Sequence, residues 1–263
     1  MMKRIYPLIT IVTVTYNAGS VLERTLRSVE AQAYPRIEHL LIDACSKDAT
    51  LSLVREYVER NTQPTHNIRV LSEPDKGLYD AMNKAIGMAE GDYIVFLNAG
   101  DALHDNNTIE ELVKAMEWEH RGVNPAVVYG ETDLVDNEGN FIRHRRLQAP
   151  ERLTAHSFLS GMLVCHQSFY VRTDLARQIR YNLDYRFSAD YDWCVRILKH
   201  AEKRRIRITN THLILTDYLS EGLTTQNHRK SLKERFHIMS KHYGMLSAIG
   251  AHLWFVIRSV IKK

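Results

Sequence analysis

The first hundred residues alternate between short apolar segments and longer amphipathic ones, and this alternation limits the fold more than any other feature of the chain. Four segments are short, mostly apolar and followed by polar or small residues, as strands are. They are residues 8–15, 37–43, 68–72 and 93–97. The segments between them repeat apolar side chains at helical spacing, and they are residues 20–32, 49–60 and 78–89. This order predicts right-handed βαβ units and a parallel sheet covered on both faces.

The chain after residue 125 has a less regular pattern. Strand-like runs on both sides of a turn at residues 137–140 predict a hairpin. Residues 166–171 are strand-like, and residues 190–200 have the spacing of an amphipathic helix. No repeat and no linker rich in Pro, Gly or Ser divides the chain, so we expect one α/β domain over residues 1–221.

The composition is that of an ordinary globular protein. The chain has 263 residues, 44% of them apolar, and a mean hydropathy of −0.32, which is enough for one sizeable core. Its three cysteines, Cys45, Cys165 and Cys194, are odd in number and far apart, which argues against a disulfide framework or a zinc site. The apolar run at residues 8–14 is not followed by a small-residue cleavage pattern, so we expect a cytoplasmic protein.

The basic charge of the chain lies in its last part. Residues 222–263 contain eight Lys or Arg and a single acid, Glu234, while the formal net charge of the whole chain is +4. No aromatic and basic recognition module accompanies this charge, so we expect no nucleic acid as partner. An anionic membrane surface is the partner that the charge favours.

Residues 245–261 are strongly apolar, but His252 and Arg258 interrupt them and they fall short of the roughly 20 residues needed to span a bilayer. A helix would gather several apolar side chains on one face, namely Leu246, Ile249, Leu253, Val256 and Val260. This pattern favours a helix lying in the membrane interface, and a helix packed on the domain or in a dimer is the alternative. We therefore treat residues 222–263 as a basic amphipathic extension that places the protein peripherally on the inner face of the cytoplasmic membrane.

Polar residues follow each of the four predicted strands, at residues 15–17, 43–48, 73–77 and 98–101. Because the carboxyl ends of parallel strands meet at one edge of a sheet, all four clusters are expected to lie where ligands bind. Asp43 is suited to a base or ribose, Lys76 to a phosphate, and Asp101 to a divalent cation. Taken singly, each cluster is equally explained by a helix cap or a turn. Taken together, they favour a nucleotide site.

The same stretches resemble the inverting GT-A glycosyltransferases of family 2, which make bacterial polysaccharides such as O-antigens. The matching segments are 11–17 (IVTVTYN), 41–50 (LIDACSKDAT), 72–85 (SEPDKGLYDAMNKA), 96–101 (FLNAGD), 128–130 (VYG), 165–167 (CHQ) and 189–192 (ADYD). They occur in the family's order over about residues 8–220. The resemblance implies a GT-A fold, that is, a Rossmann-like, mostly parallel sheet flanked by helices, with a helical C-terminal extension.

The resemblance also implies roles for the polar residues at the strand ends. Thr15, Asn17 and Asp43 would line the nucleotide pocket, and Asp43 would read the base. Asp75 and Lys76 would lie near the ribose and the diphosphate. These five residues form the donor side of the expected site.

The turn at residues 98–101 resembles the family's acidic metal motif, but two acids are missing. Asn98 stands at the first acidic position, where it would still face the nucleotide, and Gly100 replaces the middle acid. Asp101 alone is left to bind Mn²⁺ or Mg²⁺, which puts strict metal dependence in doubt.

Asp190 matches the position of the family's catalytic base. It would take the proton of the acceptor hydroxyl in a single displacement that inverts the anomeric carbon. A helix N-cap is the structural alternative, and Asp192 could take either role. Burial beside Tyr191 and Trp193 is expected to raise the pKa of Asp190. The resemblance also places His166 and Gln167, at the start of a predicted strand, on the acceptor side together with Asp192. A hydrogen bond to the acceptor sugar or to the diphosphate is expected there, and a structural role for His166 is the alternative.

The expected function is transfer of a hexosyl or N-acetylhexosaminyl group from a nucleotide-diphosphate sugar to a glycan or lipid-linked glycan in cell-surface polysaccharide synthesis. A UDP-sugar is the favoured donor. The alternative is a catalytically silent relative that holds nucleotide or glycan, because Asn98 and Gly100 replace acids. A nucleotidyltransferase would need a Gly-rich basic loop after the first strand, and residues 15–19 are not such a loop.

Overall fold

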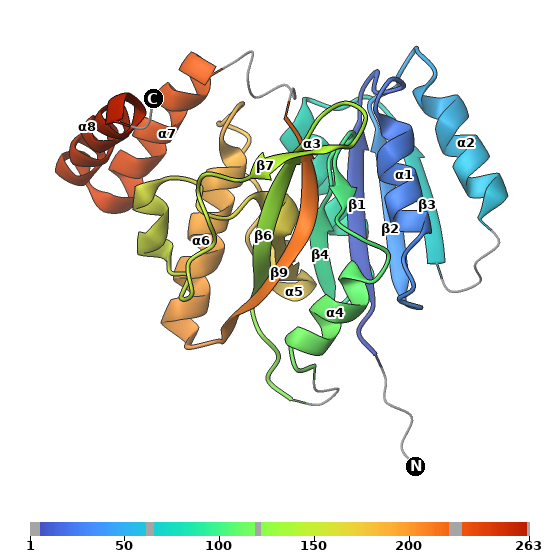
Figure 1. Ribbon diagram of the computed structural model, residues 1–263, viewed down its shortest axis with the longest axis horizontal. Helices are drawn as coiled ribbons and strands as arrows, with labels where there is room; N and C mark the ends of the chain where they lie inside the picture. Colours follow the sequence, from blue (N-terminus) through green and yellow to red (C-terminus); the bar gives the residue numbers. More distant parts are fainter. Residues whose placement is uncertain (1–5, 62–65, 119–121, 221–227, 262–263) are drawn as a thin grey trace.

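The strands of the protein join into one mixed sheet with helices on both faces (Figure 1). The structure is a computed structural model that describes residues 6–61, 66–118, 122–220 and 228–261. The strands are β1 (Ile9–Thr15), β2 (Ile37–Asp43), β3 (His66–Ser72), β4 (Tyr93–Phe96), β5 (Ala102–Leu103), β6 (Val127–Val135), β7 (Phe141–His144), β8 (Phe169–Arg172) and β9 (Ile208–Leu219). The helices are α1 (Leu22–Glu30), α2 (Thr50–Arg60), α3 (Leu78–Met88), α4 (Thr108–Ala115), α5 (Thr173–Gln178), α6 (Ala189–Arg204), α7 (His228–Tyr243) and α8 (Met245–Ile261), with the 3-10 turns η1 (Ala155–Ser160) and η2 (His166–Ser168).

The first half of the sheet is parallel, as the sequence predicted. β1 lies between β2 and β4, and β3 pairs with the outer side of β2. The register places Thr15 beside Asp43 and Asp43 beside Ser72, at the carboxyl ends of three neighbouring strands. β1, β2 and β4 are buried along their whole length because helices cover both faces. The predicted alternation of strands and helices is therefore confirmed.

The second half of the sheet adds antiparallel pairs. β8 runs antiparallel to β4 and β6, β9 is parallel to β6, and β5 is antiparallel to β9. The predicted hairpin is present as β6 and β7, and Gly139 in its turn has a φ of +90°, which favours glycine.

The expectation that His166 and Gln167 begin a strand was wrong. Both residues lie in η2, and the strand begins at Phe169. Neighbouring side chains of a strand point to opposite faces, whereas the turn directs both of these side chains toward the loop that follows β4.

Each face of the sheet has its own core. On one face α3, α5 and α6 pack together, and the ring of Trp193 meets the edge of the Phe96 ring at 5.8 Å. On the opposite face α1 and α4 cover the sheet, with Leu112 packed among buried side chains that include Val95. α2 packs beside α1 through Tyr57. This burial fixes the strand ends that carry the polar residues.

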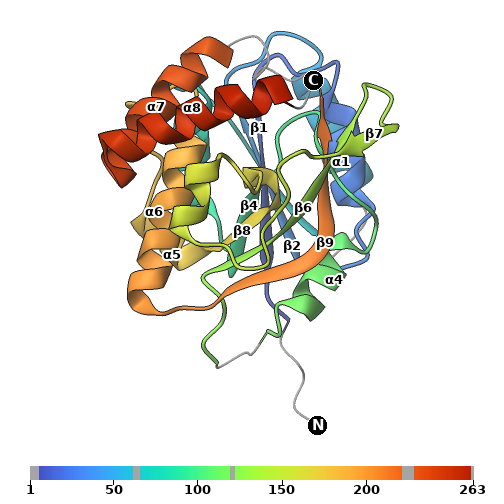
Figure 2. The ribbon, with the colours of Figure 1, turned by 60° about the vertical axis from the view of Figure 1, so that its left-hand side comes forward.

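The helices α7 and α8 lie along one side of the molecule, next to α6 (Figure 2). Ile238 and Met239 of α7 and Ala248 of α8 are buried in the same core as α6. The predicted boundary between domain and extension, at residues 221 and 222, falls outside the described residues. Among the helices described, none is long and apolar enough to cross a bilayer.

The packing around Gly130 leaves no room for a side chain, and this can be tested. A Cβ at Gly130 would lie 2.5 Å from the carbonyl oxygen of Leu213 and 2.8 Å from the side chain of Leu215, at the register shift between β6 and β9. We expect Gly130→Ala to lower the free energy of unfolding by about 1–3 kcal/mol, because backbone atoms cannot yield as a side chain can. Gly250→Ala is the control, since no heavy atom lies within 4 Å and alanine favours a helix. Equal stabilities of the two variants in chemical denaturation would contradict the packing at Gly130.

Candidate active site

Asp43 lies at the centre of a hydrogen-bond network at the carboxyl ends of β1, β2 and β3. Its carboxylate accepts bonds from the Thr15 hydroxyl at 2.9 Å, the Ser46 backbone N–H at 2.9 Å and the Ser72 hydroxyl at 2.9 Å. Burial opposes the charge, but the bonds from Ser46, Ser72 and Thr15 outweigh it and lower the pKa of Asp43. The carboxylate is therefore ionised and held in one orientation, as a group that reads a ligand must be.

Asn17 joins the loops that follow β1 and β2. It has a φ of 51°, in the left-handed region, and its backbone N–H donates to the Ser46 hydroxyl at 2.8 Å. Its side-chain oxygen accepts the Lys47 backbone N–H at 2.9 Å. The structure thus brings Asn17, Thr15 and Asp43 together at one edge of the sheet.

Asp75 and Lys76 lie in the loop between β3 and α3. The Asp75 carboxylate accepts the Gly77 backbone N–H at 2.7 Å, and the Lys76 backbone N–H donates to Asp80 at 3.0 Å. The side chain of Lys76 is exposed, and Gly77 has a φ of 116°. The loop therefore presents a cation beside the start of α3, at the same edge as Asp43.

Asp190 is contacted by side chains from two other elements, α3 and η2. It stands in the first turn of α6, where the Tyr79 hydroxyl of α3 donates to its Oδ1 at 3.1 Å. Nδ1 of His166 lies 3.4 Å from its Oδ2. Nε2 of the same ring lies 3.2 Å from the Asn98 amide nitrogen, which follows β4. An amide nitrogen donates, so Nε2 accepts and the ring proton is assigned to Nδ1, facing Asp190.

The expectation that burial raises the pKa of Asp190 was wrong in its outcome. Burial does act in that direction, but the His166 ring and the positive charge of Arg235 outweigh it, and the pKa is lowered. Tyr191, one of the neighbours invoked for this effect, is buried and directs its hydroxyl to the Phe158 carbonyl at 2.6 Å. Asp190 is therefore an ionised carboxylate at neutral pH.

Asp101 is buried and its carboxylate points inward. One oxygen accepts the Gln167 side-chain amide at 2.8 Å and the other the Leu219 backbone N–H at 3.0 Å. Burial raises the pKa of Asp101 to about 6, although these two bonds, the nearby His166 ring and the charge of Arg24 act to lower it. The carboxylate connects the loop after β4 to η2 and to the end of β9.

The residues of this loop fit a cation only in part. Among the described residues, no group of three or more His, Cys, Asp or Glu side chains is arranged to hold a metal ion. The buried amide oxygen of Asn98 has no hydrogen-bond partner, and each Asp101 oxygen keeps one lone pair beyond its present bond. A magnesium-type ion takes one or two protein oxygens and its other ligands from phosphate and water. Asn98 and Asp101 could supply these one or two protein oxygens, with phosphate and water as the remaining ligands.

The structure does not bring Asp192 into this cluster. Its carboxylate bonds to Arg196 at 2.6 Å and to His242 of α7 at 2.8 Å. Residues two apart on a helix point in different directions, so Asp190 and Asp192 cannot share one site. The expectation that Asp192 lies on the acceptor side gains no support from these contacts, which tie α6 to α7.

Three residues near Asp190 were not predicted as site residues. Tyr79 lies inside a matching segment but has the spacing of a core residue, and the contact with Asp190 spans 111 positions. Glu234 and Arg235 belong to α7, in the part assigned to an extension. The acidic Glu234, alone in a basic tail, was the one available signal.

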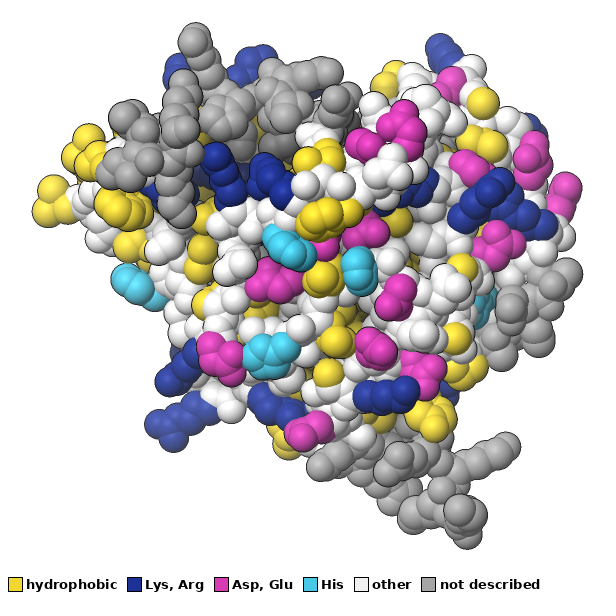
Figure 3. Space-filling model, viewed as in Figure 1, with side chains coloured by type: hydrophobic (Ala, Val, Ile, Leu, Met, Phe, Trp, Pro, Cys, Tyr) yellow, Lys and Arg dark blue, Asp and Glu magenta, His cyan; other side chains and the backbone are white. Residues whose placement is uncertain are grey.

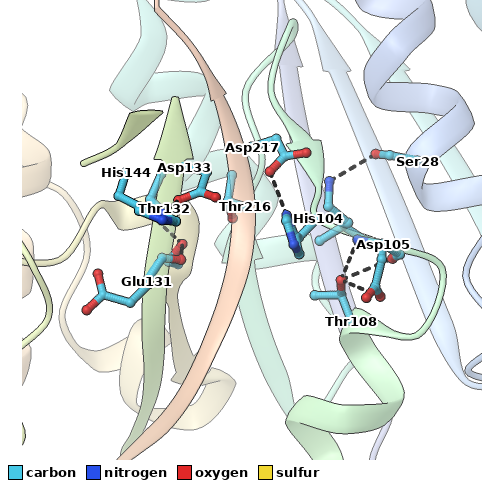
Figure 4. Close-up of polar contacts among 12 residues, drawn as sticks. Ser28, His104, Asp105, Thr108, Glu131, Thr132, Asp133, His144, Thr216 and Asp217 are labelled. Carbon is cyan, nitrogen blue, oxygen red and sulfur yellow. Dashed lines mark hydrogen bonds and ion pairs between the residues drawn. The ribbon is translucent and has the colours of Figure 1, made fainter. Parts of the chain in front are cut away.

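A second polar cluster covers the outer face of β6 and β9 (Figure 3). His144 pairs with Asp133 at 2.7 Å and His104 with Asp217 at 2.8 Å, and the two aspartates are register partners on the two strands (Figure 4). The hydrogen bond to Asp217 raises the pKa of His104. These pairs tie β7 and the end of β5 to the sheet, and the structure gives them no contact with Asp190.

The comparisons with solved structures place the fold in a class. The structure of Staphylococcus aureus TarS 1–349 in complex with UDP superposes with a TM-score of 0.64 at 16% identity, covering 90% of this chain and 66% of that one. The mannosyltransferase PcManGT from Pyrobaculum calidifontis, in complex with GDP-Man and Mn²⁺, gives 0.60 at 17% identity, covering 94% and 74%. The protein therefore has the GT-A fold.

The comparisons with sequences identify the family. Residues 10–180 match the family described as glycosyl transferase family 2, and the chain belongs to it. The PGL/p-HBAD biosynthesis glycosyltransferase of Mycobacterium bovis is 30% identical over 191 residues, which cover 72% of this chain and 69% of that protein. An uncharacterized glycosyltransferase of Mycobacterium tuberculosis is 30% identical over 204 residues, covering 76% and 72%.

Asp101→Asn tests the burial of this carboxylate. The pKa of Asp101 in the folded protein, about 6, lies above its unfolded value, so its contribution to stability is complete below about pH 4 and is lost as the pH rises through 6. From pH 5 to pH 7.5 the wild type should lose about 1.4 kcal/mol of unfolding free energy relative to Asp101→Asn. Urea denaturation of both proteins at the two pH values measures this difference. Parallel pH dependences would show that Asp101 does not bind a proton in this range.

Proposed function

We propose that the protein is an inverting transferase that moves a sugar from a nucleotide-diphosphate donor to a glycan or lipid-linked glycan acceptor in cell-surface polysaccharide synthesis. One observation carries the proposal. An ionised carboxylate, Asp190, is held by Tyr79 and His166 beside the loop after β4. The hydrogen-bond network around Asp43, where we place the nucleotide, lies at the carboxyl end of the same parallel sheet.

The donor side of the proposal rests on the network around Asp43. The Asp43 carboxylate is ionised and already accepts four hydrogen bonds, from Thr15, Ser72 and both the backbone and the hydroxyl of Ser46, so a base would bind by exchanging one of these hydroxyl bonds for its own N–H. Lys76 offers a cation to a diphosphate. A UDP-sugar is our first candidate, and a hexosyl or N-acetylhexosaminyl group is the proposed cargo. TarS has been solved with UDP and with UDP-GlcNAc, whereas PcManGT was solved with GDP-Man. UDP-sugars and GDP-sugars should therefore both be tested as donors.

The proposed reaction is a single displacement. The acceptor oxygen forms a bond to the anomeric carbon, the bond from that carbon to the diphosphate oxygen breaks, and the hydroxyl proton passes to Asp190. The low pKa of Asp190 makes it a weak base, so it takes the proton late, when the hydroxyl is already losing it. The Tyr79 hydroxyl and the His166 ring hold the carboxylate in place during this step.

We propose that a divalent cation, Mn²⁺ or Mg²⁺, accompanies the donor diphosphate. Bound there, it would neutralise charge on the departing diphosphate. The side-chain oxygens of Asn98 and Asp101 would bind this cation, and the Gln167 amide keeps the Asp101 carboxylate oriented. A single carboxylate predicts weak affinity for the metal in the absence of nucleotide.

Asp190→Asn and Asp192→Asn separate the catalytic from the structural aspartate. We expect Asp190→Asn to lower kcat by about 10²–10⁴-fold with little change in Tm, because only the proton acceptor is lost. Asp192→Asn should lower Tm and retain most of kcat, since it breaks the buried pairs with Arg196 and His242. Transfer from UDP- and GDP-sugars, with and without Mn²⁺, provides the readout. Full activity of Asp190→Asn would reject its role, and no turnover by the wild type would favour a silent nucleotide-binding relative.

We further propose that α8 docks on an anionic membrane from the cytoplasmic side. One face of α8 packs on α7 and η1, and its outward face is apolar and exposed, with Leu246 86%, Leu253 61% and Trp254 53% accessible. Figure 3 shows yellow, hydrophobic side chains along the edge of the molecule where Figure 1 places α8. The basic charge of the tail suits anionic lipid and would repel a second copy of the same face.

Vesicle binding tests the membrane contact. We expect the protein to sediment with phosphatidylcholine vesicles containing phosphatidylglycerol, and to bind less at high salt or to pure phosphatidylcholine. The double variant Leu246→Gln and Leu253→Gln should lose binding, whereas Val123→Gln, an exposed apolar residue elsewhere, should not. Unchanged binding of the double variant, or a concentration-dependent dimer without vesicle binding, would overturn the proposal.

A further inference from the structure

Helix α7 is fastened to the segment that carries Asp190. The Glu234 carboxylate accepts three consecutive backbone N–H groups, those of Arg186 at 2.9 Å, Phe187 at 2.7 Å and Ser188 at 2.9 Å. The Ser231 hydroxyl, one turn earlier on α7, lies 2.9 Å from the Ser188 hydroxyl. A carboxylate that accepts three backbone donors fixes the entry into α6 strongly. The position of α7 relative to Asp190 is therefore set by direct bonds.

This attachment places Arg235 beside the proposed base. Its guanidinium lies over the ring of Tyr191, 5.9 Å from the centroid. Its charge helps to lower the pKa of Asp190, and it opposes in part the burial that raises the pKa of Tyr79. The charge therefore reaches the position where the acceptor hydroxyl and the anomeric carbon must meet in the proposed reaction.

Arg235 lacks the partners that an arginine in such a place normally has. Its Nε is buried without a hydrogen bond, and within the described part of the chain no carboxylate forms an ion pair with its guanidinium. By contrast, Arg196 on the neighbouring helix α6 has a carboxylate partner, Asp192, at 2.6 Å. A buried donor without an acceptor costs free energy, so its presence calls for an explanation. An anionic ligand on the guanidinium would supply the missing charge partner.

The chemistry of the proposed reaction supplies such an anion. Charge grows on the departing diphosphate, and preorganised cations are the means by which a site stabilises it. The loop after β4 offers one carboxylate, Asp101, already bonded to Gln167, so it attracts a metal ion weakly. A guanidinium can bind phosphate oxygens through two N–H groups without a metal.

We propose that Arg235 is a ligand for a phosphate or diphosphate group at the transfer site, and that it shares with any bound metal the neutralisation of that group. The inference rests on the proposed function for its choice of anion. The diphosphate belongs either to the nucleotide sugar or to a lipid-linked acceptor. A competition experiment distinguishes these two sources.

Binding of inorganic pyrophosphate in metal-free buffer tests the proposal directly, by calorimetry on the full chain. We expect Arg235→Gln to weaken pyrophosphate binding about tenfold or more, and Arg235→Lys to restore part of it, because a charged hydrogen bond is lost and then partly replaced. Lys233→Gln removes the same charge from an exposed position on the same helix and should bind as the wild type does. Tm values identify variants that fail to fold.

Competition then assigns the source of the group. Displacement of pyrophosphate by UDP or GDP places Arg235 on the donor diphosphate, and displacement only by a short polyprenyl diphosphate places it on the acceptor. Wild-type affinity of folded Arg235→Gln for pyrophosphate would overturn the inference while leaving sugar transfer intact. Absence of sugar transfer with an Arg235-dependent pyrophosphate site would instead reject the proposed function and retain the anion site.

Discussion

The parallel pairing of β1 with β2 and β4, and of β2 with β3, is the constraint on which the rest of the structure depends. Because these strands run in one direction, their polar ends meet at one edge, and Thr15, Asp43 and Ser72 become neighbours across three strands. Each hydrogen bond to Asp43 then offsets part of the cost of burying a charge. Strand order therefore decides where a charged group can be held in a largely buried sheet.

The second half of the molecule adds a carboxylate to that edge by a different route. Asp190 comes from the start of α6, and it depends on Tyr79 of α3, on the turn η2 and on the attachment of α7 through Glu234. The entry into α6 is thus held by hydrogen bonds from a helix more than forty residues later. A truncation before α7 would remove these bonds together with the buried side chains of Ile238 and Met239.

The parallel half of the fold was predictable because its strands and helices each show a characteristic spacing of apolar residues, and because polar residues follow each strand. The same local patterns pointed to Asp43 and Asn17 as candidate site residues, whereas Asp190 was predicted from the family resemblance alone. Contacts between distant segments were not predictable: the bond from Tyr79 to Asp190 joins residues that each have a sufficient local explanation. The contacts of Asp192 were unpredictable for the same reason, since nothing local to α6 reveals that His242 pairs with it.

The lowered pKa of Asp190 makes sense when the donor is considered. A diphosphate brings negative charge close to the base, and like charges raise the pKa of a carboxylate. If Asp190 began above its usual value, donor binding would protonate it near neutral pH and remove the proton acceptor. The His166 ring and the charge of Arg235 lower the pKa in advance, so the carboxylate has room to rise and still remain ionised in the complex. The electrostatics around Asp190 thus agree with its proposed role as a base beside an anionic donor.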